Sequence, residues 1–262
     1  MSRQDAAMKR AAVTENSPVY LYTFTDYEDT HSNTVTVIIQ DKRALLIDPS
    51  YPEFAERVKD DLESQGIKPG VIVLSHYHPD HVSGCTALPQ CDVYAGEDYE
   101  SNYTNCQVWE PGYTYVRPKF LIKDGDTLNF GEFTLKFLHA PGHSKCSLIT
   151  RITDRLIHIG DQVMISWERK NTLPYVADGG SFEGHIKSLE LIKTLDPDAV
   201  IIPHGGLVDN KNRIASLLED RLYYLEKTLN SQGSLPLEQC LKNDKSWYGH
   251  LDFHDINLVH LF

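Results

Sequence analysis

The 262-residue chain lacks any uninterrupted apolar run long enough to span a bilayer. Its first 17 residues, MSRQDAAMKRAAVTENS, lack the apolar segment of a secretory signal. It also lacks a Cys-x-x-Cys pair, and its five cysteines are an odd number. These absences count against a disulfide framework, so we expect a cytoplasmic protein whose thiols stay free in a reducing compartment.

Basic residues are also in short supply. The chain has 25 Lys and Arg against 37 Asp and Glu, which gives a formal net charge of −12, and the basic residues form no cluster. An acidic surface repels phosphate at long range, which argues against nucleic acid or an anionic membrane as a partner. We therefore expect a small-molecule substrate, and we leave a homodimer open.

The first third of the chain alternates strand-like and helix-like segments. Strands are predicted where β-branched and aromatic residues lie between turn formers, and the sequence Gln40-Asp41-Lys42 predicts a hairpin turn between two of them. Residues 51–65 have helical apolar spacing and end before Gly66. The predicted strands span residues 18–25, 33–40, 43–49 and 71–74.

The remainder of the chain predicts a second β-rich half, with helices over 182–195 and 211–230. Residues 99–118 are aromatic and irregular, and we expect a long loop there. Two β-rich halves, each closed by helices, predict a layered α/β sandwich. We expect a flexible N-terminus over 1–17 and one domain over 18–262, with a short C-terminal helical extension from about 211.

Four side chains that can bind metals follow the apolar run VIVL within six positions: His76, His78, Asp80 and His81. In an extended segment alternate side chains point the same way, so His76 and His78 can bind one cation. Imidazole suits zinc. A lone histidine at a strand end is usually structural, but this density favours a metal site.

Three more polar residues close apolar strands farther along the chain. His143 follows a Pro-Gly turn, Asp161 ends LIHIGD, and His204 ends AVIIPH. Each one alone is weak, because an Asp after a strand is commonly a helix cap. Together with the first motif they bring five histidines and two aspartates to one edge of a sheet, which is enough for a dinuclear site.

In this order, His76-x-His78-x-Asp80-His81, Gly142-His143, Gly160-Asp161 and His204 resemble the metallo-β-lactamase superfamily over residues 18 to 215. The resemblance implies an αββα sandwich of two mixed β-sheets flanked by helices, and two divalent metal ions. It implies that three residues hold the first metal, three hold the second and one bridges them: His76, His78 and His143; Asp80, His81 and His204; and Asp161.

The resemblance also implies a hydrolase in which a metal-bound hydroxide attacks a carbonyl. Asp80 is the catalytic candidate, as the residue that orients the hydroxide and moves its proton. The iron-binding branch of the family has Glu where this chain has His78, so we expect zinc, with iron or manganese as alternatives. We expect Asp48 to fix imidazole tautomers, with a turn or helix cap as the equal alternative.

The features after Asp161 are similar to those of the thioesterase and glyoxalase II-like branch of the family. They imply a small thioester, ester or lactone as substrate. Candidate substrate-binding residues are Tyr77, Trp167 and Tyr175, although ordinary packing explains aromatic residues at such positions equally well. The alternatives are a phosphodiesterase or nuclease of the same fold, and a non-enzymatic binding protein that retains the metal site.

Overall fold

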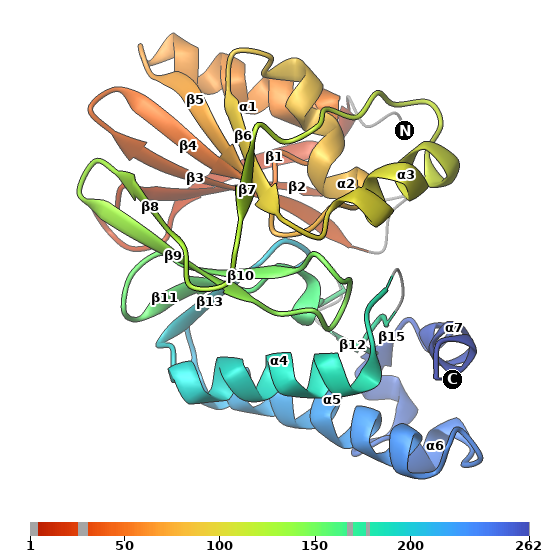
Figure 1. Cartoon of the computed structure of the whole chain (residues 1–262). Helices are drawn as coiled ribbons and strands as arrows, with labels where there is room; N and C mark the ends of the chain where they lie inside the picture. The colour runs from red at the N-terminus through yellow and green to blue at the C-terminus, as the bar shows by residue number, and fades with distance from the viewer. Residues whose placement is uncertain (1–4, 26–30, 167–169, 177–178, 262) are drawn as a thin grey trace.

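The computed structural model describes residues 5–25, 31–166, 170–176 and 179–261 (Figure 1). The described elements of the first half are β1 (Ala7–Ala12), β2 (Val19–Thr25), β3 (Ser32–Gln40), β4 (Arg43–Ile47), α1 (Pro52–Ser64), β5 (Lys68–Val73), α2 (Pro79–Val82), η2 (Ser83–Ala87), β6 (Asp92–Gly96), α3 (Glu100–Trp109) and β7 (Phe120–Ile122).

Those of the second half are β8 (Thr127–Phe130), β9 (Phe133–His139), β10 (Leu148–Arg151), β11 (Leu156–His158), η3 (Gly160–Gln162), β12 (Asn171–Thr172), α4 (Phe182–Leu195), β13 (Ala199–Ile202), β14 (Gly206–Val208), α5 (Lys211–Asn230), α6 (Leu237–Cys240), η4 (Lys245–Trp247), β15 (Tyr248–Gly249) and α7 (Phe253–Val259).

Two mixed sheets form the centre of the molecule. The first has the order β1-β2-β3-β4-β5-β6-β7, antiparallel up to β4 and parallel from there on. The second has the order β14-β13-β11-β10-β9-β8. The predicted hairpin turn joins β3 to β4, where Asp41 and Lys42 both have the positive φ that the tightest hairpins require.

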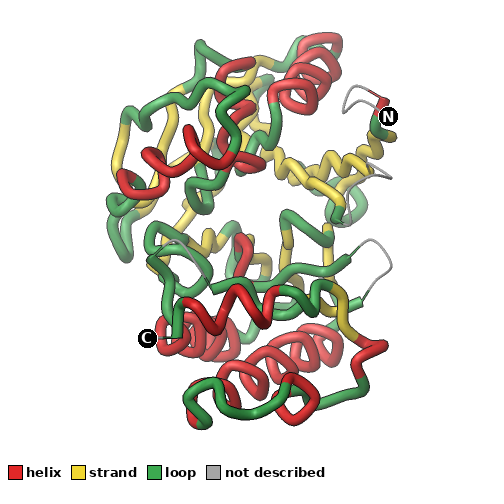
Figure 2. The backbone as a smooth tube through the Cα atoms, turned by 90° about the vertical axis from the view of Figure 1, so that its right-hand side faces the viewer, coloured by secondary structure: helices red, strands yellow, loops and turns green. Residues whose placement is uncertain are grey.

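The sheets lie between helices, as the views from two sides show (Figures 1 and 2). Phe54 of α1 stacks on Phe24 at 4.2 Å on the outer face of the first sheet. Leu189 of α4 and Leu218 of α5 belong to the core on the outer face of the second sheet. A third core, which includes Leu45 and Phe137, lies between the sheets. The predicted αββα sandwich is therefore confirmed.

Two expectations about irregular segments are wrong. The sequence predicts a flexible segment over 1–17, but Ala7–Ala12 form β1, which pairs with β2 along its full length. It predicts a loop over 99–118, but Glu100–Trp109 form α3. Both segments bury few side chains, and α3 buries only Asn102 and Cys106, so neither carries a periodic apolar pattern that sequence analysis could detect.

The C-terminal part folds back on the second sheet. The helix predicted over 211–230 is α5, which packs against α4, and the short pair β12–β15 joins the C-terminal segment to the loop after η3. All five cysteines are free thiols, as expected. Within the described residues, no helix combines the length and the apolar character needed to cross a membrane.

Candidate metal centre

The first four candidate ligands leave the carboxyl end of β5. The chain runs extended through His78, which has φ −105° and ψ 153°, and Pro79 then begins the short helix α2 that carries Asp80 and His81. Alternation along the extended segment sends His76 and His78 toward the same side. The helical turn that follows turns His81 back toward them, and its ring centroid lies 4.0 Å from that of His76.

The other three candidate ligands come from strand ends of the second sheet. His143 follows β9 through a turn at Gly142, where a Cβ atom would lie 2.5 Å from the Cα of His185. Asp161 follows β11 through Gly160, whose φ of +53° suits glycine. His204 follows β13 after Pro203. The gap between the two sheets is therefore bridged by side chains from both.

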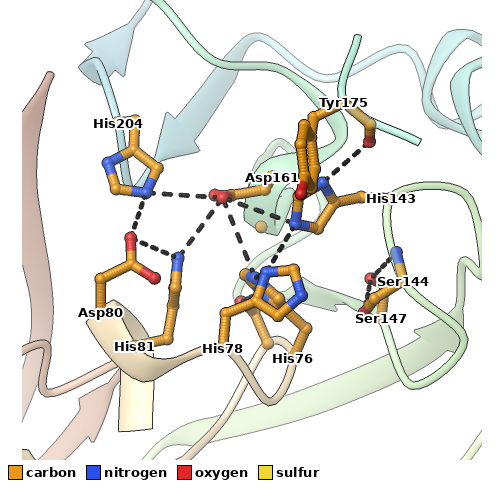
Figure 3. A network of polar contacts seen from close by, with 12 residues as sticks. His76, His78, Asp80, His81, His143, Ser144, Ser147, Asp161, Tyr175 and His204 are labelled. Carbon is orange, nitrogen blue, oxygen red and sulfur yellow. Dashed lines mark hydrogen bonds and ion pairs between the residues drawn. The ribbon is translucent and has the colours of Figure 1, made fainter. Parts of the chain in front are cut away.

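The seven side chains converge in two sets of three around Asp161 (Figure 3). In the first set, Nδ1 of His78 lies 3.0 Å from Nε2 of His76 and 3.0 Å from Nε2 of His143. In the second set, Oδ2 of Asp80 lies 3.0 Å from Nε2 of His204 and 3.6 Å from Nε2 of His81. Each set is compact enough to surround one cation.

Asp161 lies between the two sets. Its Oδ2 atom is 3.4 Å from Nε2 of both His81 and His204, and 3.9 and 3.8 Å from Nε2 of His76 and His143. One carboxylate oxygen thus faces donors of both sets, which is the placement of a bridging ligand. Asp161 is only 5% exposed, so most of its side chain is shielded from solvent.

The tautomers of four of these histidines follow from their partners. Nδ1 of His143 faces the carbonyl of Tyr175 at 3.0 Å, and Nδ1 of His204 faces the carbonyl of Ser32 at 3.1 Å. A carbonyl only accepts a hydrogen bond, so Nδ1 carries the proton in both rings. The unprotonated Nε2 of each neutral ring then points toward Asp161, ready to bind a cation.

Asp48 fixes the other two rings, as expected for it. Its carboxylate accepts hydrogen bonds from the Ser75 amide at 2.7 Å and the Ser75 hydroxyl at 2.6 Å, and Nδ1 of His81 lies 3.0 Å from it. Because the Ser75 hydroxyl donates to Asp48, it accepts from Nδ1 of His76, 3.0 Å away. Asp48 therefore orients one ring of each set.

This donor set fits divalent metal ions. The Nε2 atoms of four histidines lie 3.4–3.9 Å from one buried oxygen of Asp161. While the four rings are neutral, this buried group of atoms lacks a positive charge to balance the carboxylate. Nε2 of His81 and Oδ1 of Asp161 are buried and have no hydrogen-bond partner among the described residues. Imidazole and carboxylate are the usual protein ligands of zinc.

In the protein without bound metal, protons supply the missing positive charge. Burial lowers the pKa of His81, but the nearby carboxylates, Asp161 first, raise it well above its usual value. Burial also lowers the pKa of His204, but Asp161 and Asp80 outweigh it and raise this pKa to about 10. Burial would raise the pKa of Asp161, yet His204 and His81 hold it well below the usual range.

A cavity of about 200 Å³ opens onto the two sets. Tyr175, a candidate for substrate binding, lines it. Tyr77 does not: it is fully buried and donates its hydroxyl to the carbonyl of Val116. The alternation that directs His76 and His78 to the metal side sends the residue between them to the other side. Trp167 lies outside the described residues.

Several residues around the site were not predicted. The carbonyls of Ser32 and Tyr175 orient ligands, and backbone groups leave no signal in side-chain spacing. Ser75 directly precedes the first motif, so its position in the sequence could have suggested it. His31 and Phe253 line the cavity from segments far apart in the chain. Only the tertiary structure brings such residues together.

Comparison with known proteins agrees with this geometry. The profile of the metallo-beta-lactamase superfamily matches residues 29–204, so the chain belongs to that superfamily. A hydroxyacylglutathione hydrolase from Enterobacter sp. (strain 638) is 25% identical over 242 residues, which cover 87% of this chain and 85% of that protein.

A probable polyketide biosynthesis zinc-dependent hydrolase from Bacillus velezensis is 27% identical over 192 residues, covering 70% of this chain and 76% of that protein. Among solved structures, a metallo-beta-lactamase family protein from Thermus thermophilus superimposes with a TM-score of 0.66 over 82% of this chain and 81% of its own. At 15% identity this likeness shows the fold alone.

Removing the charge of Asp48 should weaken metal binding. Asp48→Asn leaves the Ser75 hydroxyl and the His81 ring without a carboxylate acceptor, and loss of such orienting partners costs about 10–100-fold in metal affinity. Competition with a chromophoric chelator measures this change. Asp154→Asn is the matched control, because its carboxylate is 90% exposed and outside the site. Equal affinities for the two variants would contradict the role of Asp48.

Metal binding should release protons. At pH 7 the raised pKa values keep His81 and His204 protonated in the metal-free protein, and a cation must displace these protons from Nε2. Metal affinity should therefore fall as pH decreases and rise with pH toward about 10, the pKa of His204. Calorimetry in buffers of different ionisation enthalpy counts the protons. Binding without proton release at pH 7 would refute this expectation.

Proposed function

We propose that the protein is a hydrolase that uses two divalent metal ions, zinc in preference to iron or manganese, to cleave a small thioester, ester or lactone. The observation that carries the proposal is the position of one Asp161 oxygen between two complete sets of three donors. Metal ions in such sites lower the pKa of water toward neutrality and polarise carbonyl or phosphoryl oxygens.

The exposure of the candidate ligands distinguishes those that only bind metal from the one that can also act on water. Six of the seven candidate ligands are buried, whereas the side chain of Asp80 is 28% exposed. Asp80 also contacts Nε2 of His204 at 3.0 Å, so its carboxylate is held at the boundary between the donor set and the cavity. We assign to Asp80 the orientation of the attacking water and the movement of its proton.

The cavity favours a carbonyl substrate over a phosphodiester. Among the described residues its lining includes no Lys or Arg, the side chains that bind phosphate groups best. Two relatives, 25% and 27% identical to this chain, are named as hydrolases, one for hydroxyacylglutathione and one as zinc-dependent, which supports thioester chemistry and zinc. The five free thiols suit a reducing compartment such as the cytoplasm.

A phosphodiesterase of the same fold is the second candidate, because phosphodiester cleavage can use the same donor set. A binding protein without activity is the third. It would explain the donors but would give no role to Asp80 at the cavity boundary. The net charge of −12 counts against a polyanionic substrate.

The first experiment is metal analysis of the purified, metal-replete protein, together with a panel of a thioester, a lactone and a phosphodiester before and after chelation. We expect close to two metals per chain, and cleavage of the thioester or lactone that chelation abolishes. Phosphodiester cleavage alone would favour the second candidate. Absence of bound metal would overturn the proposal.

A ligand variant tests the assignment of the site in the same assays. His76→Ala removes a first-set donor and should lower both metal content and activity, by more than the 10–100-fold typical of losing an orienting partner. His139→Ala is the matched control, because His139 is partly exposed and hydrogen-bonds the Lys145 carbonyl outside the donor set. Equal losses in both variants would indicate a general effect of histidine removal.

A further inference from the structure

An arc of six aromatic rings connects the two metal-ligand sets, and all of its rings except His250 line the cavity. It starts at His143 and ends at His204, both candidate ligands. Successive ring centroids lie 5.5, 5.0, 4.8, 4.4 and 5.4 Å apart. In order, the rings of this arc belong to His143, Tyr175, Phe253, His250, His31 and His204.

The middle of this aromatic arc comes from the C-terminal segment. Phe253 begins α7, and His250 precedes it in a backbone conformation with φ +53°. Figure 1 shows α7 next to the β12–β15 pair, and Phe253 at the start of α7 lines the cavity. The C-terminal extension therefore contributes directly to the wall of the cavity and not only to the outer helical layer.

Asn257 of α7 holds the arc in place. It is fully buried, its Oδ1 accepts a hydrogen bond from the Val176 amide at 2.8 Å, and its Nδ2 donates to the Pro174 carbonyl at 2.8 Å. These two partners flank Tyr175. The same amide donates to the Tyr224 hydroxyl at 3.1 Å, which anchors α7 to α5. One side chain thus fixes the position of Tyr175 relative to Phe253.

The arc presents a surface suited to a flat apolar group. Tyr175 and Phe253 both line the cavity, and their ring planes meet at 63° in an edge-to-face contact, an arrangement that aromatic groups prefer. Met164 adds a polarizable side chain to the lining.

We propose that the aromatic arc selects the acyl part of the substrate, and that this acyl group is planar and uncharged. Phe253 and Tyr175 are the specificity-determining contacts, and Asn257 is a positioning residue that acts through Tyr175. The inference rests on the proposed function, since it names the acyl class for the same site.

The test compares two thioesters that differ only in the acyl group, S-benzoyl- and S-acetyl-N-acetylcysteamine, on the metal-loaded protein. The wild type should have the higher kcat/KM for the benzoyl thioester. Phe253→Ala should reduce the benzoyl-to-acetyl ratio of kcat/KM by about tenfold, the scale of one aromatic contact. Val259→Ala is the matched control on the same helix, because Val259 is 76% exposed. An unchanged ratio in Phe253→Ala would overturn the proposal.

A binding measurement tests the arc independently of catalysis. Benzoate and acetate share the carboxylate that can reach the metals and differ in the group that meets the arc. Calorimetry should show benzoate binding several-fold more tightly, with the preference lost in Phe253→Ala. If the wild type cleaves neither thioester, the proposed function fails, but the preference for benzoate over acetate still tests whether the arc binds a planar group. Equal affinities in the wild type would refute the arc alone.

Asn257→Asp separates positioning from simple stability. The substitution keeps an acceptor for the Val176 amide but replaces the donor to the Pro174 carbonyl with a carboxylate oxygen. We expect the benzoate preference to fall by several-fold. Asn129→Asp, which adds the same charge at an exposed position of β8, is the control. A lower melting temperature with an unchanged benzoate preference would show that Asn257 has only a structural role.

Discussion

The arrangement of the site depends on the buried carboxylate of Asp48. It receives the amide and hydroxyl of Ser75 and lies 3.0 Å from the His81 ring, so it determines which nitrogen of two imidazoles faces the centre. Asp48 and Ser75 follow the neighbouring parallel strands β4 and β5, whose carboxyl ends meet at one edge of the sheet. The pairing of these two strands thereby sets the orientation of one candidate ligand in each donor set.

The same edge also makes protons and cations competitors for the donor nitrogens. Four lone pairs around the Asp161 carboxylate repel one another, and raised pKa values at His81 and His204 allow protons to compensate. Protons and metal ions thus compete for the same nitrogens. Orienting partners outside the donor set favour the cation, because each one keeps the ring proton on Nδ1 and leaves the lone pair of Nε2 available.

The features that could be predicted from the sequence share a local origin. The helices at Phe182–Leu195 and Lys211–Asn230 have strong apolar periodicity, and the residues of the His76 to His81 motif are contiguous. The helices and the motif can therefore be recognised from the sequence alone. The strand β1 and the helix α3 lack such a pattern, so sequence analysis misses them. Tyr77 is misassigned when its place inside the motif is given more weight than strand alternation, which directs it away from the cavity.

Apart from the candidate ligands, the residues of the cavity wall are harder to predict from the sequence. Residues that bind metals must be of a few chemical types, and their spacing records the strand ends that carry them. Residues that contact an acyl group need only shape and apolar character, which many buried positions share. Phe253 is one aromatic residue among many in the sequence. Its position in the cavity wall can be recognised only from the structure, where Asn257 holds it against Tyr175, 78 positions earlier in the chain. The donor sets and the aromatic arc share His143 and His204, and the Tyr175 carbonyl orients His143, so the C-terminal segment that holds Tyr175 affects both.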